Sequence, residues 1–95
     1  MPHKIYAKNP DIVFRKIADE VILVPIRHSV GNLDSIYTLN EVSARIWELI
    51  DGKRTMKDIK EIILQEFDVT NEEAEKDLIQ FLQQLEKIEG IRAAD

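Results

Sequence analysis

The chain has 95 residues, of which 44% are hydrophobic and 33% are charged, which is typical of one globular domain over residues 1–95. It has no cysteine, so a disulfide framework, a thiolate zinc site and a thiol nucleophile are excluded. The net charge of −5 disfavours general nucleic-acid binding, because an acidic domain repels phosphates. No apolar stretch approaches the roughly 18 residues that span a membrane, and the N-terminus lacks a signal-peptide layout. We therefore expect a cytoplasmic protein without a membrane partner.

The first part of the chain is expected to form three short strands. It is rich in β-branched and aromatic residues, and its polar turns contain residues that tolerate unusual backbone angles. Pro25 cannot donate a ladder hydrogen bond, so a bulge or the end of pairing is expected near it. The pattern predicts an antiparallel meander with strands at 12–17, 21–26 and 33–39 and turns at 18–20 and 31–32.

The rest of the chain has helical periodicity. A first helix is expected from about Glu41 to Ile50, capped by Asn40 or Thr38 and stopped by Asp51-Gly52. Thr55 caps a second helix, and Thr70 caps a third with Glu73 in the capping-box position. The apolar stripes of the three helices are Val42, Ile46, Leu49 and Ile50, flanked by Trp47; Met56, Ile59, Ile62, Ile63 and Phe67; and Ala74, Leu78, Phe81, Leu82, Leu85 and Ile88.

These elements together predict an α+β fold. No Pro/Gly/Ser linker separates the strands from the helices, so both belong to one β-β-β-α-α-α unit. A three-stranded antiparallel meander followed by a three-helix bundle is winged-helix-like in outline.

No residue pattern for catalysis is found. His3 and His28 have no histidine or carboxylate at metal-ligand spacing, and a site would need several convergent ligands. The carboxylates fall on polar helix faces, where pairs such as Glu72/Lys76 stabilise a helix by about 0.2–0.5 kcal/mol. The glycines are scattered and form no phosphate loop. We therefore predict a protein that is not an enzyme and has no metal and no cofactor.

A winged-helix outline raises DNA binding as an alternative. The third helix of such a reader enters the major groove, but residues 70–89 here carry six acidic and two basic residues. Repulsion from phosphates would remove the main source of affinity. One basic cluster lies at the start of the second helix and consists of Lys53, Arg54, Lys57 and Lys60. It could be a solvated face of the helix, a contact surface for an acidic partner or a weak phosphate contact.

Binding of another polypeptide has better support. A short meander leaves an edge strand with unpaired backbone groups, and the predicted strand at 33–39 contains no proline. Ile79 lies outside the apolar stripe of the third helix. Its position fits two interpretations equally: a second contact face on this helix, or an apolar side chain that packs in the ordinary way or is singly exposed. A generic interaction module or a homodimer formed through the edge strand is a further alternative.

One segment resembles a known family. Residues 37–52 look like the hallmark stretch of the PqqD family, named for the small protein D of pyrroloquinoline quinone biosynthesis. The pattern is a Leu-Asn-Glu start, a small residue, an Ile-Trp pair and a Leu-Ile-Asp-Gly end, with a threonine starting the next helix. The matching residues are Leu39, Asn40, Glu41, Ser43, Ile46, Trp47, Leu49, Ile50, Asp51, Gly52 and Thr55.

The resemblance implies a non-catalytic peptide-recognition module. Such domains bind the leader of a ribosomally synthesised precursor peptide and present it to a modifying enzyme, frequently a radical S-adenosylmethionine maturase. The leader adds as a strand to the third strand and lies against the third helix. Carried over to this chain, the resemblance implies a strand side at Leu33, Asp34, Ser35, Ile36, Tyr37 and Thr38 and a helix side at Ala74, Asp77, Leu78, Phe81 and Leu85.

Overall fold

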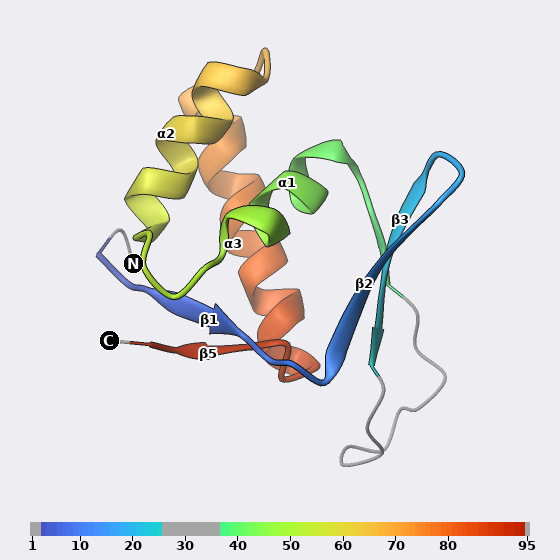
Figure 1. Cartoon of the computed structure of the whole chain (residues 1–95). Helices are drawn as coiled ribbons and strands as arrows, with labels where there is room; N and C mark the ends of the chain where they lie inside the picture. Colours follow the sequence, from blue (N-terminus) through green and yellow to red (C-terminus); the bar gives the residue numbers. More distant parts are fainter. Residues whose placement is uncertain (1–2, 26–36, 95) are drawn as a thin grey trace.

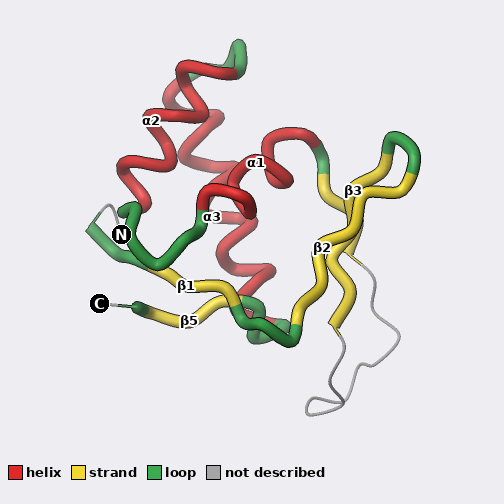
Figure 2. Tube along the Cα trace, viewed as in Figure 1, coloured by secondary structure: helices red, strands yellow, loops and turns green. Residues whose placement is uncertain are grey.

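The computed structural model of the chain describes residues 3–25 and 37–94. It has the predicted α+β architecture, an antiparallel meander followed by three helices, and it adds a second, two-stranded sheet (Figures 1 and 2). In chain order the elements are β1 (Tyr6–Lys8), β2 (Ile12–Ile17), β3 (Glu20–Pro25), β4 (Tyr37–Leu39), α1 (Glu41–Leu49), α2 (Met56–Glu66), α3 (Asn71–Lys87) and β5 (Ile91–Ala93).

The meander has the strand order β2-β3-β4 with antiparallel pairing throughout. Ile17 pairs with Glu20 across a two-residue turn, in which Ala18 has φ 55°. Glu20 therefore belongs to β3, and its predicted place in the turn is wrong. Cross-strand partners share a face of the sheet, so the register Phe14–Leu23–Tyr37 puts these three side chains on one face. Leu23 on this face is fully buried.

β3 is the central strand of the meander. Among the described residues it pairs with β2 over Glu20–Pro25, with Pro25 opposite Ile12, and with β4 over Val21–Leu23. The described part of β3 reaches Pro25, so the bulge or end of pairing expected near this proline stays a prediction. The predicted turn at 31–32 and the predicted strand residues 33–36 lie outside the described residues.

The three helices begin where the sequence predicts. Asn40 caps α1, and its side chain accepts a hydrogen bond from the Ser43 backbone N–H. Thr55 and Thr70 form reciprocal capping boxes with Asp58 and Glu73. α1 ends before Gly52, whose φ of +78° is a conformation that favours glycine.

The second sheet joins the two ends of the chain, which the sequence analysis missed. β1 and β5 pair antiparallel from Tyr6–Ala93 to Lys8–Ile91. The other edge of β1 faces the loop before α2, where the Gly52 N–H donates to the Tyr6 carbonyl and the Met56 N–H donates to the Lys4 carbonyl. β1 therefore lies between β5 and this loop, below the helices in Figure 1.

One continuous core holds these elements together. It takes side chains from both sheets and all three helices, and the described residues include no buried polar or charged residue. Trp47 belongs to this core with 3% of its surface exposed. The core residues are Tyr6, Ile12, Leu23, Leu39, Ile46, Trp47, Leu49, Ile50, Met56, Ile59, Ile63, Ala74, Leu78, Phe81, Leu82, Leu85 and Ile91.

Candidate functional site

The outer edge of β4 is the first feature of the candidate site. β4 pairs with β3 on one side, and within residues 3–25 and 37–94 no strand pairs with its other side. The C-terminal strand β5 pairs with β1 and not with β4. Alternate residues of an edge strand direct their N–H and C=O groups outward. Along its described length, β4 therefore offers backbone groups to another extended chain.

A groove lies beside this edge. It is a cavity of about 180 Å³ between the end of β4, the start of α1 and the middle of α3. Its walls are mostly polar, with two apolar residues. The lining residues are Thr38, Leu39, Asn40, Ser43, Asp77, Gln80, Phe81 and Gln84.

Local structure fixes the side chains on both walls. On the β4–α1 wall, Asn40 is held by its cap, because its Oδ1 accepts the Ser43 N–H at 2.8 Å. On the α3 wall, the spacing of residues 77, 80, 81 and 84 puts them on one helix face. Phe81 anchors that face in the core with 3% exposure, while Asp77 is half-buried.

The predicted site residues divide into three groups. Thr38, Asp77 and Phe81 line the groove, and Tyr37 stands beside Thr38 on β4. Three predicted residues of α3 are buried in the core and do not line the groove: Ala74, Leu78 and Leu85. The remaining four lie outside the described residues: Leu33, Asp34, Ser35 and Ile36.

Four polar lining residues were not predicted from the sequence. Asn40 was identified as a helix cap and not as a wall of a groove, and Ser43 follows it by one turn. Gln80 and Gln84 were not singled out. The sequence does contain a signal for them: Gln80 and Gln84 follow Asp77 by three and seven residues, a spacing that puts side chains on one helix face.

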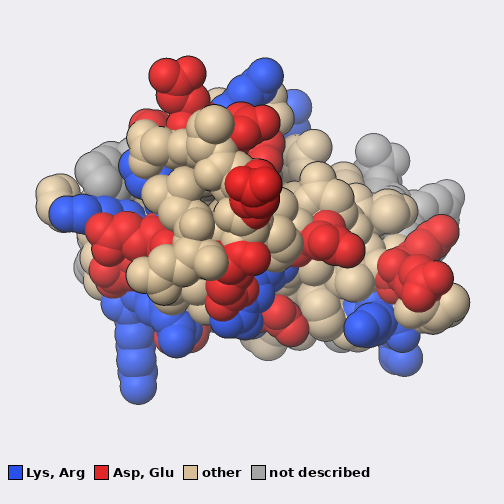
Figure 3. Space-filling view, turned by 90° about the horizontal axis from the view of Figure 1, so that it is seen from above, with Lys and Arg blue, Asp and Glu red and all other residues tan. Residues whose placement is uncertain are grey.

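The electrostatics of the groove contrast with those of the neighbouring surface. Among the described lining residues, Asp77 is the one charged residue. Some acidic residues elsewhere have basic partners: Arg45 Nε and Nη2 donate to both carboxylate oxygens of Glu66 at 2.8 and 2.9 Å. This bidentate contact lowers the pKa of Glu66 and raises that of Arg45. Figure 3 shows acidic side chains spread across the middle of the face seen from above the helices.

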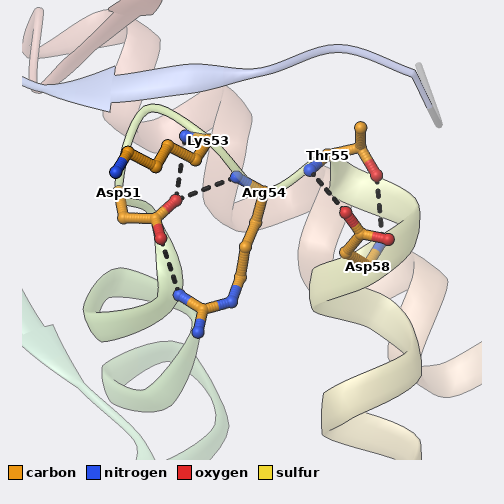
Figure 4. Close-up of polar contacts among 5 residues, drawn as sticks. All are labelled: Asp51, Lys53, Arg54, Thr55 and Asp58. Carbon is orange, nitrogen blue, oxygen red and sulfur yellow. Dashed lines mark hydrogen bonds and ion pairs between the residues drawn. The ribbon is translucent and has the colours of Figure 1, made fainter.

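The basic cluster at the start of α2 is partly neutralised. The Asp51 carboxylate accepts the backbone N–H groups of Arg54 and Lys53, each at 2.9 Å, and the Arg54 guanidinium at 2.8 Å (Figure 4). The two backbone hydrogen bonds, that of Arg54 first, lower the pKa of Asp51. Lys60 lies 4.0 Å from Glu75 on α3. These contacts leave Lys53 and Lys57 as the exposed cations of the cluster.

The described part of the chain contains no cluster of metal ligands, because no three His, Asp or Glu side chains come together there to hold a metal ion. His3 is exposed, and His28 lies outside the described residues. Among the same residues, no helix is both long enough and apolar enough to cross a bilayer. Ile79, outside the apolar stripe, is half-buried and lines a separate depression on α3.

Comparison with known proteins gives one family and two similar structures. The family model described as coenzyme PQQ synthesis protein D (PqqD) matches residues 20–89. The chain is similar to TbiB1 in its complex with the TbiA(beta) leader peptide, with 27% identity and a TM-score of 0.71 over 90% of this chain and 94% of that one. Lasso peptide synthetase B1, complexed with the leader peptide, shares the fold at 17% identity, with a TM-score of 0.72 over 92% and 96% of the chains. None of the curated proteins compared with the chain matches it.

Proposed function

Because this chain belongs to the family of coenzyme PQQ synthesis protein D, PqqD, we propose that it is a non-catalytic peptide-binding chaperone. It captures the leader of a ribosomally synthesised precursor peptide and presents that peptide to a modifying enzyme. The leader adds as a strand to the outer edge of β4, and its inward side chains occupy the groove against α3.

The observation that carries this proposal is the open edge of β4 directly beside the groove. Thr38 and Leu39 belong to the edge strand and also line the groove, so one extended peptide can use both. TbiB1, which has the same fold at 27% identity, is a protein in complex with a leader peptide. The fold and the open edge therefore support the same function.

Backbone pairing would supply affinity, and the groove would supply specificity. Each added backbone hydrogen bond contributes about 1 kcal/mol net. Side chains of an added strand that lie opposite Tyr37 and Leu39 share their face of the sheet, which is the face of buried Leu23. We propose that residues 33–38 form the strand side of the site, with backbone pairing at residues 35–37; of these, residues 33–36 lie outside the described residues. Phe81 forms the apolar floor of the groove, and three buried residues hold α3 in place beneath it: Ala74, Leu78 and Leu85.

The modifying enzyme is the second partner in this proposal. A radical S-adenosylmethionine maturase, or another peptide-modifying enzyme, would receive the leader bound on this domain. The chain contains no cysteine, and its described histidine, His3, is exposed and is not among the residues that line the groove. The chemistry therefore belongs to the partner enzyme, and this chain supplies recognition.

The two alternative functions make different predictions. DNA binding through α3 requires cations on its exposed surface, where residues 70–89 carry six acids and two bases. Homodimerisation through β4 uses the same edge as the peptide, so a peptide would compete with it. Neither alternative accounts for the groove that continues from the edge to α3.

Hydrogen exchange on the full chain tests the proposal. Overlapping synthetic peptides from short reading frames that flank the gene are added, and amide protection is measured. A leader is expected to protect amides of Tyr37–Leu39, whereas β2, the other edge strand of the meander, serves as internal control. Peptide binding that protects β2 and leaves β4 unchanged, or the absence of any binding peptide, would contradict the proposal.

A further inference from the structure

Asp77 has an unusual position among the acidic residues of α3. It is half-buried at the groove, and no hydrogen bond or ion pair is found for it among the described residues. Two other acids of the helix have partners, since Glu73 closes a capping box and Glu75 lies 4.0 Å from Lys60. The remaining two, Glu72 and Glu86, are exposed to solvent. The Asp77 carboxylate is therefore available to accept a hydrogen bond from an occupant of the groove.

Among the described residues that line the groove, none carries a positive charge that could pair with Asp77. Apart from Asp77, these residues have hydroxyl, amide and apolar side chains. The Asn40 amide oxygen already accepts the Ser43 N–H. An occupant with an ammonium or guanidinium group would provide a charge-assisted hydrogen bond to Asp77, about twice as strong as a neutral one.

The spacing of the α3 wall matches that of an extended peptide. Asp77 and Phe81 are four residues apart on one helix face, which is roughly 6 Å along the helix axis. Side chains at positions i and i+2 on one face of a strand are about 6.6 Å apart. One residue of an added strand can therefore meet Phe81 while the next residue on the same face meets Asp77.

We propose that Asp77 makes the groove between β4 and α3 selective for an extended peptide that carries a lysine or arginine two positions from an apolar residue. This inference rests on the proposed function and specifies the class of peptide. The apolar residue packs on Phe81, and the cation pairs with Asp77. The excess of acids along residues 70–89 attracts such a peptide during encounter, so its association rate falls as salt is added.

A displayed library of random short peptides provides a probe that requires no knowledge of the natural leader. The full wild-type chain and its Asp77→Asn variant, which is nearly isosteric, serve as parallel baits. Glu86→Gln is the matched control, because it removes one negative charge from the same helix at an exposed residue that does not line the groove. Circular dichroism establishes that the baits are folded, and hydrogen exchange identifies which enriched peptides protect Tyr37–Leu39.

We expect the wild type and Glu86→Gln to enrich peptides that carry Lys or Arg two positions from an apolar residue. Asp77→Asn should lose this preference for a basic residue. The affinity of Asp77→Asn for an enriched basic peptide should fall roughly 10-fold to 100-fold. An Asp77→Lys bait should enrich Asp or Glu at the same position. Peptides that protect β4 without a basic preference would overturn this inference and leave the proposed function standing. If no peptide that protects β4 is enriched, both are contradicted.

Discussion

Lys8 lies over the indole ring of Trp47, with its Nζ 5.4 Å from the ring centroid. This cation–π contact joins β1 to α1. Burial lowers the pKa of Lys8, and the nearby charges of Glu48 and Asp51 act in the opposite direction. The tryptophan of the hallmark segment therefore supports the junction of the two-stranded sheet with the helices, and it does not line the groove.

Replacement of Trp47 by alanine should destabilise the protein by about 3–5 kcal/mol, since it removes a large side chain from the core. The indole is 3% exposed. Urea unfolding monitored by circular dichroism measures the change, and Trp47→Phe should retain more of the stability. An unfolding midpoint close to that of the wild type would contradict the place of Trp47 in the core.

The stabilising contribution of Asp51 should depend on pH. Its pKa in the folded protein lies below the ordinary value of 3.8 because the Arg54 and Lys53 backbone N–H groups donate to its carboxylate. Because the folded-state pKa is lowered, the ionised carboxylate contributes its full stabilisation above the unfolded-state value of 3.8. This contribution is lost as the pH falls through the folded-state pKa and the carboxylate becomes protonated. The stability difference between wild type and Asp51→Ala should therefore shrink in acid. A difference that stays constant across this range would contradict the assignment.

Removal of the cap of α3 should cost about 1 kcal/mol in the free energy of unfolding. Thr70 Oγ1 accepts the Glu73 N–H at 3.1 Å, and the Thr70 N–H donates to Glu73 Oε1 at 2.9 Å. Thr70→Ala removes the first of these bonds, whereas Thr70→Ser keeps a hydroxyl at the same place and is the control. Equal stability of the two variants in urea unfolding would show that the capping box contributes little.

A cation placed in the groove should weaken binding of a basic peptide. Gln84 lines the groove and its neighbour Gln83 does not, although both are exposed residues of α3. Gln84→Lys should therefore reduce affinity, by roughly threefold to tenfold, because it adds a positive charge to the groove that holds the bound cation. Gln83→Lys carries the same change of net charge and should bind nearly as the wild type does. Calorimetric titration with one peptide enriched on the wild-type chain compares them, and equal affinities would contradict this placement of the occupant.

The helices were predictable because their signals are local. A cap and its partner are three residues apart, so Thr55 with Asp58 and Thr70 with Glu73 are recognisable in the sequence itself. β1 and β5 were not predictable in the same way. Each has three residues, and their pairing joins Tyr6 to Ala93, nearly the whole chain apart. Such short, non-local pairing leaves almost no periodicity to detect.

The candidate site was predictable in part. Asp77 and Phe81 were expected on the helix side of the cleft and do line it. Periodicity marks the apolar face of α3, however, and that face packs into the core, as Leu78 and Leu85 do. The groove lies beside the apolar stripe, where Gln80 and Gln84 look like ordinary solvated residues in the sequence.

The pairing of β1 with β5 brings the two ends of the chain together. The Asn9 N–H donates to the Gly90 carbonyl and the Ala94 N–H donates to the Ile5 carbonyl, each at 2.8 Å, and the paired strands β1 and β5 lie below the helices in Figure 1. A short linker between the first and last residues of the chain would allow a circular permutant, with new chain ends at exposed Asp68 between α2 and α3. Every strand pairing would be kept in this permutant. A fused domain could then be attached between α2 and α3.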